Sequence, residues 1–336
     1  MNIEIVRGLP EEEWRHFVEE HPAGNIFHTP EMFQVFESAR GHRPLLHAAI
    51  GEDRRVLALL LPVQLTLMNG LLRRLTTRSV AYGGVLCSSG VAGEKALEIL
   101  LHNYSECAAR EALFTEMRHL SDPAAIQPVL TRCGYTFENH LDYLIDLNYS
   151  PEQLMRSIGP RTRKHIRQAL RKGKITFEEV TDRSQITDWY ELIRKTYLTA
   201  RVPLTDRSLF EAAFDILYPR GMVIFWLGRL GTATVSASVE LLYKDVIYCW
   251  YAGVDRSYTN ELPGELLRWH ILEWGAIHGY KTFDFGGAGK PDEHYGPRDF
   301  KAKFGGELVN YGRNICVHCP NLLRLSKLGY KFYHHA

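Results

Sequence analysis

A glycine-rich segment in the last fifth of the chain constrains the fold most strongly. It follows an amphipathic run over residues 263–278, in which Leu267 and Trp274 lie seven residues apart and predict one apolar helix face. The buried-strand pattern Phe283-Asp284-Phe285 comes next and leads directly into Gly286-Gly287-Ala288-Gly289. We therefore expect a helix, a buried strand and a glycine loop in that order, and such a loop lets a substrate approach the backbone.

A basic segment follows the glycine loop and contains Phe300 and Lys301. It predicts a short helix that places one apolar anchor and one cation beside the strand end. Lys301 is a candidate catalytic residue there, and the alternative is a surface lysine that closes the turn over residues 300–304. Asp284 alternates with two phenylalanines, so it either accepts a proton or orients an amine, or it caps the turn at Gly286 and Gly287.

The length of the chain, 336 residues, suits two domains of roughly 150 residues each. Both halves contain meandering strands followed by helix and strand, and residues 223–251 predict an antiparallel meander. The expected fold is mixed α/β, with two tandem units that each hold a mostly antiparallel mixed sheet flanked by helices. Because the pattern breaks at Asn148-Tyr149-Ser150-Pro151, we expect domains at residues 1–150 and 151–336.

The densest run of positive charge lies just past that expected boundary. Residues 154–176 contain no Asp or Glu, and on a helix Arg163, Arg167 and Arg171 share one face while Ile166 and Leu170 share another. Such a helix can dock by its apolar side and hold the phosphates of a nucleotide-linked substrate or of tRNA. The alternative is a solvated connector helix.

Composition excludes several other classes of protein. The net charge of +1 gives no global attraction for DNA, so polyanion binding must be local. The longest apolar run, residues 56–63, is far shorter than the roughly 20 residues of a membrane span, and the start of the chain lacks a secretory pattern, so we expect a cytoplasmic protein. Cys316-Val317-His318-Cys319 has metal-ligand spacing, but no second pair matches it, and no metal is expected.

Five segments, in this order and spacing, resemble the FemAB-like family of non-ribosomal peptidyl (aminoacyl) transferases of the FemX type, which is related to the GNAT acetyltransferase fold. They are Asn25-Ile26-Phe27-His28-Thr29-Pro30, Gly134-Tyr135, Arg163-Lys164-His165-Ile166-Arg167-Gln168-Ala169, Pro263-Gly264-Glu265-Leu266-Leu267-Arg268-Trp269, and Phe283-Asp284-Phe285-Gly286-Gly287 through Phe300-Lys301-Ala302-Lys303-Phe304-Gly305-Gly306.

The resemblance implies tandem GNAT-like domains and transfer of an activated acyl group to a primary amine. In family members that build peptidoglycan cross-bridges during cell-wall biogenesis, the donor is aminoacyl-tRNA and the acceptor is the amine of a muramyl peptide precursor. The resemblance assigns Lys301 to the donor ester and its developing oxyanion, and Arg201 to the acceptor phosphates. Tyr248 and Tyr251 would line the sheet near the same end, or belong to the core.

The sequence also departs from the family. Glu37 stands where FemX-type enzymes carry a lysine that holds the nucleotide sugar, which disfavours a UDP-linked acceptor. No bound cofactor is expected, and the co-substrate is aminoacyl-tRNA or, alternatively, acyl-CoA. Asn260-Glu261-Leu262-Pro263-Gly264-Glu265 replaces the usual pyrophosphate loop and weakens the acyl-CoA alternative. A third reading is a non-catalytic binding module of an envelope polysaccharide system.

Overall fold

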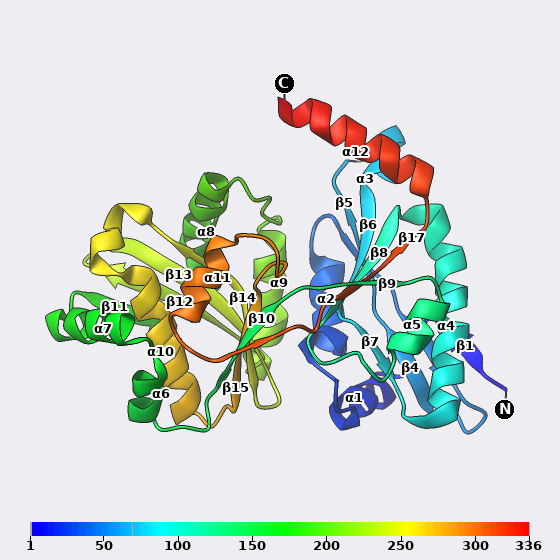
Figure 1. Cartoon of the computed structure of the whole chain (residues 1–336), viewed down its shortest axis with the longest axis horizontal. Coiled ribbons are helices and arrows are strands. Elements are labelled where there is room, and N and C mark those ends of the chain that lie inside the picture. The colour runs from blue at the N-terminus through cyan, green and yellow to red at the C-terminus, as the bar shows by residue number, and fades with distance from the viewer. Residues whose placement is uncertain (1, 69, 336) are drawn as a thin grey trace. The chain divides into compact units, whose positions relative to one another are not determined.

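The computed structural model describes residues 2–68 and 70–335, which divide into two compact units (Figure 1). Unit 1 contains Met1–Asn139 together with Tyr311–Ala336, and unit 2 contains His140–Asn310. The expected domains were residues 1–150 and 151–336. The boundary between them moves from residue 150 to residue 139, and residues 311–336 belong to unit 1 rather than to unit 2. Strand β10 (Asp142–Asp146) pairs within the sheet of unit 2, and β17 (Arg313–Val317) returns to a sheet of unit 1, because each strand finds its hydrogen-bonding partners there.

Unit 1 holds two sheets. The six-stranded sheet has the order β2 (His42–Pro44), β5 (Val63–Thr66), β6 (Thr77–Gly83), β8 (Phe114–His119), β17 and β9 (Thr136–Glu138). The four-stranded sheet has the order β1 (Glu4–Val6), β3 (His47–Ile50), β4 (Val56–Leu60) and β7 (Val85–Cys87). The helices of this unit are α1 (Glu11–Glu20), α2 (Pro30–Ser38), α3 (Arg73–Thr76), α4 (Gly90–Glu111), α5 (Gln127–Arg132) and α12 (Pro320–His335).

The core of unit 1 forms where α4 packs on β3 and β4. Leu97, Leu100 and Leu101 of α4 are fully buried in this cluster. Strand β17 is fixed to the same unit by side chains as well as by its ladder, since Asn314 bonds His119 at 2.7 Å. These contacts explain why the end of the chain belongs to unit 1.

The Asn25-to-Pro30 segment of the family resemblance has a packing role in unit 1. Asn25 caps the short 3₁₀ helix Ile26–His28, and Thr29 caps α2. Gly83 has φ +79°, and a Cβ there would come within 3.0 Å of the Asn25 and His28 side chains. The segment therefore holds the end of β6, where only glycine fits.

Unit 2 is built on one seven-stranded sheet. Its order is β11 (Ile175–Glu179), β12 (Val223–Leu230), β13 (Ala233–Tyr243), β14 (Val246–Val254), β15 (Thr282–Gly287), β10 and β16 (Glu307–Val309). The helices are α6 (Pro151–Ser157), α7 (Pro160–Lys172), α8 (Ile186–Ala200), α9 (Ser208–Leu217), α10 (Pro263–Ile277) and α11 (Gly296–Ala302). Among the strands that the structure describes, only β14 and β15 run parallel in this sheet, and only β6 and β8 do so in unit 1. Mostly antiparallel mixed sheets flanked by helices are therefore confirmed in both units.

Helices cover both faces of the unit 2 sheet. Trp226 of β12 contacts His270 of α10, whereas its neighbour Phe225 contacts Trp189 of α8. Because successive strand residues point to opposite faces, α10 and α8 lie on opposite sides of the sheet. No described helix in either unit is long and apolar enough to cross a bilayer.

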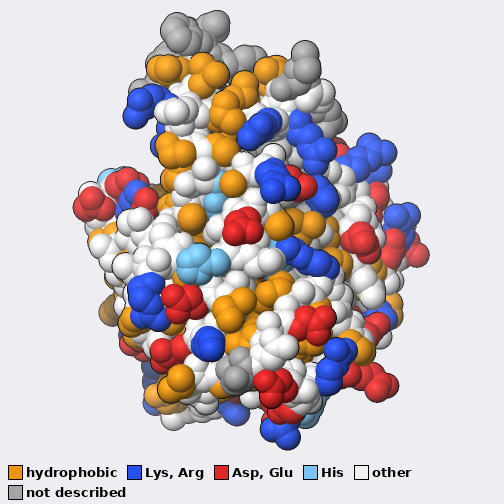
Figure 2. Space-filling view, turned by 90° about the vertical axis from the view of Figure 1, so that its right-hand side faces the viewer, with side chains coloured by type: hydrophobic (Ala, Val, Ile, Leu, Met, Phe, Trp, Pro, Cys, Tyr) orange, Lys and Arg blue, Asp and Glu red, His pale blue; other side chains and the backbone are white. Residues whose placement is uncertain are grey.

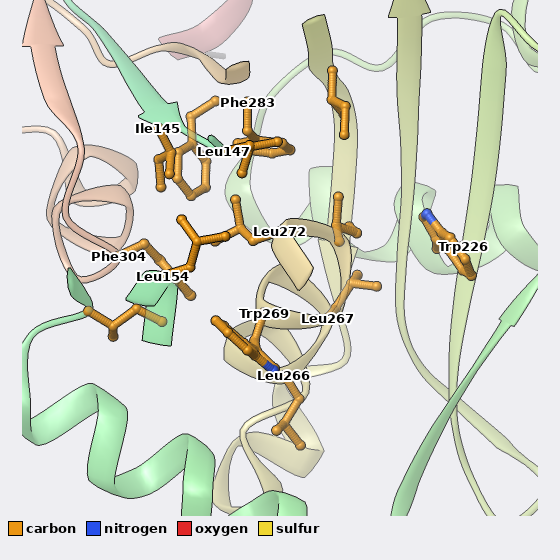
Figure 3. Close-up of a cluster of buried hydrophobic side chains, with 14 of the residues drawn as sticks. Ile145, Leu147, Leu154, Trp226, Leu266, Leu267, Trp269, Leu272, Phe283 and Phe304 are labelled. Atoms are coloured by element: carbon orange, nitrogen blue, oxygen red, sulfur yellow. The ribbon is translucent and has the colours of Figure 1, made fainter. Parts of the chain in front are cut away.

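The predicted apolar face of α10 forms the centre of the unit 2 core. Leu267 and Leu272 are almost fully buried beside Phe283 of β15 (Figure 3). Trp274, at the other end of the predicted stripe, is only partly buried against this cluster. The helix thus begins and ends within one residue of the prediction and presents the predicted face to the strand that carries the glycine loop.

A buried ion pair joins α10 to β13. The Arg268 guanidinium donates to Glu240 at 3.2 Å, and the two side chains are 5% and 0% exposed. Arg268 also lies over the rings of Phe283 and Phe285, at 5.0 and 5.1 Å from their centroids. Burial raises the pKa of Glu240 although Arg268 opposes this effect. The pair therefore depends on both of its members.

We expect either single substitution, Glu240→Met or Arg268→Met, to lower the free energy of unfolding by about 3–5 kcal/mol, because each leaves one buried charge without its partner. The double variant should lose less than either single variant, since two apolar side chains of similar length fill the site. Urea unfolding of the four proteins measures this coupling. Additive losses would show that the two residues act independently.

Candidate active site

The site begins where the ladder between β14 and β15 stops. Their parallel pairing runs from Val246 and Thr282 to Tyr248 and Asp284 and ends there, although both strands continue. Beyond that point β14 stays paired with β13, with a bulge at residues 239–240 of β13, and β15 stays paired with β10. The ends of these two central strands therefore form no hydrogen bonds to each other. Backbone groups on the facing edges can then bond to other partners.

The glycine loop turns three carbonyls of this strand end toward one point. Gly286 has φ +70°, a conformation that glycine adopts without strain and other residues rarely do. The Lys301 ammonium of α11 donates to the carbonyl oxygens of Phe285, Gly286 and Gly287 at 2.7, 2.6 and 2.9 Å. An ammonium has three hydrogens, so in this conformation all of its donors are engaged.

Lys301 is therefore not the surface lysine of the alternative interpretation. Its ammonium lies 5.9 Å from the centroid of the Phe285 ring and is partly buried. Burial lowers the pKa of Lys301, and the nearby carboxyl groups of Asp142 and Asp284 oppose that effect. The residue holds the glycine loop in place and brings a positive charge to the point where the strands separate.

Two buried carboxyl groups lie beside this lysine. Asp284 is 4% exposed and Asp142, on the neighbouring strand β10, is 7% exposed. Asp284 accepts a hydrogen bond from the Gly286 amide at 2.7 Å, which is the turn-capping contact expected as one alternative. Burial and the Asp142 carboxylate, to which Asp284 is hydrogen-bonded, raise the pKa of Asp284 well above its usual range. Each carboxyl group therefore opposes ionisation of the other, and the pair shares one proton up to a higher pH than an isolated aspartate would hold it.

Cys249 connects this site to the buried ion pair. Its thiol accepts a bond from Arg268 at 3.2 Å, and burial raises its pKa to about 12, so it is a neutral thiol. The hydroxyl of Tyr248 would be 3.5 Å from a Cβ atom placed at Gly286. Tyr248 therefore lies beside the glycine loop.

The other predicted residues divide between this site and other parts of unit 2. The Phe300 ring packs against Phe304, 5.4 Å between centroids, and against Gly264 at the start of α10, so it anchors α11. The ring of Tyr251 packs on that of Phe210 of α9, with 4.9 Å between their centroids. This contact favours the alternative in which Tyr251 belongs to the core. Arg201 is exposed and ends α8 in a left-handed conformation with φ +54°.

The basic helix α7 forms where it was predicted. Ile166 is fully buried, but Leu170 is 45% exposed, so the apolar side of the helix docks mainly through its first half. Arg167 and Arg171 are exposed, and Arg163 donates to the Arg156 carbonyl at 2.6 Å. The helix packs on α6 and α10, and it starts beside α11, because the Gly159 amide donates to the Lys303 carbonyl at 3.1 Å.

Four residues of the site were missed by sequence reasoning: Asp142, Glu240, Cys249 and Arg268. A single acid inside an apolar strand pattern, as at Glu240, and a single arginine on the apolar face of a helix, as at Arg268, were signals for a buried pair. Asp142 carried no such signal, because only strand pairing brings it to Asp284.

The Cys316-to-Cys319 segment does not gather metal ligands. His318 bonds the Thr115 hydroxyl at 2.7 Å, and Cys319 donates to the Ala109 carbonyl. Among the residues that the structure describes, no group of three His, Cys, Asp or Glu side chains could hold a metal ion.

The shared proton of the carboxyl pair predicts a pH dependence of stability. Because the pKa of Asp284 is higher in the folded than in the unfolded chain, the folded state holds the extra proton, and its stability falls as pH rises between these two values. Asp284→Asn keeps an acceptor for the Gly286 amide and carries no charge. Wild type should therefore lose more stability than this variant between pH 5 and pH 8.

Urea unfolding at both pH values measures the difference. Asp146→Asn is the matched control, because it makes the same change at the exposed end of β10 and should follow wild type. Parallel pH profiles for wild type and Asp284→Asn would contradict the shared proton.

Comparison with known proteins agrees with this architecture. Residues 160–301 match the family model described as acetyltransferase (GNAT) domain. No curated protein sequence matches the chain. The chain is similar to the crystal structure of FemX, with 18% identity, coverage of 97% of this chain and 99% of that chain, and a TM-score of 0.73.

Two further solved structures are similar to this chain over most of its length. A tandem GNAT protein from the clavulanic acid biosynthesis pathway shares 13% identity, covers 94% of this chain and 99% of its own, and has a TM-score of 0.62. The C-terminal domain of a putative lysylphosphatidylglycerol synthetase from Agrobacterium fabrum shares 14% identity, covers 94% and 93%, and has a TM-score of 0.57.

These identities are low, so the structural likeness establishes the fold, and the domain match lies within unit 2, where Lys301 is its last residue. Together they support an acyl transferase role. The chain has the tandem GNAT-type fold of FemX, and its unit 2 matches the acetyltransferase (GNAT) domain family.

Proposed function

We propose that this chain transfers an activated aminoacyl or acyl group from a carrier to a primary amine at the end of β15. The observation that carries the proposal is the Lys301 ammonium, fixed by three convergent carbonyls where β14 and β15 separate. Transfer of this kind needs no enzyme nucleophile. It needs a positioned amine and a positive charge near the carbonyl oxygen that becomes negative.

The proposed step forms one bond and breaks one. The neutral amine nitrogen bonds to the carbonyl carbon of the donor, the carbonyl oxygen gains negative charge, and the carrier oxygen or sulfur then leaves with the bonding electrons. Of the three Lys301 hydrogen bonds, the one to Gly287 is longest and most exposed. We propose that the donor oxygen replaces the Gly287 carbonyl there, so Lys301 meets the charge as it develops.

The carboxyl pair supplies a place for the proton that the amine loses. In the state with one shared proton, the Asp142–Asp284 pair keeps one negative charge, so it can accept a second proton and then pass it to the departing carrier. Because Asp284 is bonded to the Gly286 amide, the pair is fixed to the same loop as Lys301.

The proposed donor is aminoacyl-tRNA, which places the reaction in the cytoplasm. The exposed arginines of α7 suit a phosphate backbone, and α7 begins next to α11. By contrast, the start of α10, where the acyl-CoA alternative would bind pyrophosphate, carries Glu261 and Glu265 and has Pro263 in place of one amide donor. Lys174 and Lys303 form ion pairs with those two acids, so both ammonium groups are already engaged and do not offer pyrophosphate an unpaired cation.

The proposed acceptor is an amine-bearing precursor of the cell envelope, as in peptidoglycan cross-bridge formation. The resemblance to the FemX type supports this class. Glu37 is exposed on α2, where an acid repels phosphate, so we propose an acceptor that is not held through a nucleotide diphosphate at this position.

We expect the protein to release tRNA from a mixture of aminoacyl-tRNAs when a lysine-containing peptide is the amine acceptor. Lys301→Met should lower the rate by roughly 10²-fold or more, because the charge beside the donor carbonyl is lost while the side-chain length is kept. Deacylated tRNA and modified peptide are measured together, and acetyl-CoA replaces the tRNA in a parallel assay.

Lys303→Met is the matched control for this assay. It removes a lysine two residues away, whose exposed side chain pairs with half-buried Glu265 rather than with the glycine loop, and it should keep near-normal turnover. If the protein turns over acetyl-CoA but not aminoacyl-tRNA, the donor is an acyl-CoA and the proposed tRNA donor is wrong. If neither tRNA nor CoA is released, the non-catalytic binding module is favoured. If Lys301→Met is fully active, the role assigned to Lys301 is wrong.

We expect the double variant Arg167→Glu/Arg171→Glu to weaken tRNA binding and to flatten its salt dependence, because fewer counterions are released on association. Arg194→Glu/Arg220→Glu changes the same charge elsewhere on the surface of unit 2 and serves as control. Affinity for tRNA is measured by filter binding at several salt concentrations. If both double variants bind like wild type, α7 is a solvated connector helix.

A further inference from the structure

A second surface of unit 1 combines exposed apolar side chains with positive charge. Between β5 and β6, Leu67, Met68 and Leu72 are 78%, 49% and 45% exposed, and on α12 Leu325 and Leu328 are 55% and 51% exposed. We call these five residues the apolar platform. Large apolar side chains this exposed and this close in sequence are uncommon on a soluble surface and mark an interaction site.

The two halves of the apolar platform lie together. Helix α12 packs against α3, which immediately follows Leu72. In Figure 1, α12 lies directly over α3 at one end of unit 1. The space-filling view shows hydrophobic side chains gathered at this end, with Lys and Arg beside them (Figure 2).

Charge at the apolar platform has a single sign. No Asp or Glu occurs in residues 63–83, which run from β5 to β6, or in residues 308–336, and these two segments build the platform. Arg73 and Arg74 flank the first segment, and Arg324 and Lys327 interleave with the leucines of α12. All four are exposed, and among the residues that the structure describes none of their side chains enters an ion pair.

We infer that the apolar platform docks on the surface of an anionic phospholipid bilayer. Apolar side chains that enter the headgroup boundary bury area, and cations alongside them contact lipid phosphates. Helix α12, with 16 residues and alternating Leu and Arg or Lys positions, has the composition of a helix that lies in the interface.

A second copy of the chain is a poorer occupant on physical grounds. A two-fold interface would place the same patch on both subunits, so the arginines of α3 and α12 would face those of the partner. Like charges brought together in this way oppose association. A bilayer that contains anionic lipid carries the opposite charge and meets the same surface favourably.

The full chain should sediment with vesicles of phosphatidylcholine that contain phosphatidylglycerol, and much less with phosphatidylcholine alone. Arg324→Glu/Lys327→Glu should weaken this binding by roughly tenfold or more, because each cation near an anionic surface contributes on the order of 1 kcal/mol. Leu325→Glu tests the apolar part in the same assay, and added salt should weaken wild-type binding.

Arg54→Glu/Arg55→Glu is the matched control. It makes the same change in charge on the exposed β3–β4 hairpin of unit 1 and should bind vesicles like wild type. Sedimentation velocity without lipid completes the test, and wild type and Leu325→Glu should show the same oligomeric state. The inference is overturned if wild type does not bind anionic vesicles, if Arg324→Glu/Lys327→Glu binds as well as wild type, or if Leu325→Glu dissociates an oligomer.

Discussion

The separation of β14 from β15 after Tyr248 and Asp284 is the constraint on which the site of unit 2 depends. A central pair of strands that parts leaves backbone carbonyls without ladder partners, and such groups must be satisfied in another way. Here a positive-φ glycine lies in a loop whose three carbonyls accept hydrogen bonds from one ammonium, so Lys301 bonds the strand end where β14 no longer does. The same contact that completes the backbone hydrogen bonding also brings a cation to the opening.

The buried charges around this opening balance only if one proton is retained. When Arg268 and Lys301 are both protonated, they supply two positive charges, which an ionised Glu240 and one carboxylate of the Asp142–Asp284 pair balance. A second ionised aspartate would leave an excess negative charge in a region of low dielectric, which is costly. This is the physical reason why the pair shares a proton, and it gives the site a group that can take up and release a proton without a histidine.

Sequence patterns predicted the local elements of this site well. The helix at residues 263–277, the strand that ends in glycines and the position of Lys301 beside it all follow from periodicity and from the special conformations of glycine. The strands of the 223–254 meander were predicted for the same reason, because alternating patterns and short turns are local signals.

Long-range pairing was the part that sequence patterns could not supply. Strand β10 has the same alternating pattern whether it pairs in unit 1 or in unit 2, so Asp142 gave no sign that it lies beside Asp284. Strand β17 likewise follows unit 2 in sequence but pairs with β8, which moved the domain boundary. The Arg268 contact to Glu240 spans 28 residues and depends on how α10 lies across the sheet.

The two units differ in what fills the end of their parallel ladder. In unit 1 the parallel ladder between β6 and β8 extends over five residue pairs, to the last residue of β6, Gly83, opposite His119. The glycines at that point admit the side chains of Asn25, His28 and His119, so the end of the ladder is filled by packing. In unit 2 half of β15 lies beyond its ladder with β14, and a cation and two carboxyl groups gather there instead. The GNAT-domain match covers the strand end of unit 2. This agrees with a packing role for the strand end of unit 1 and with the proposed reactive role for that of unit 2.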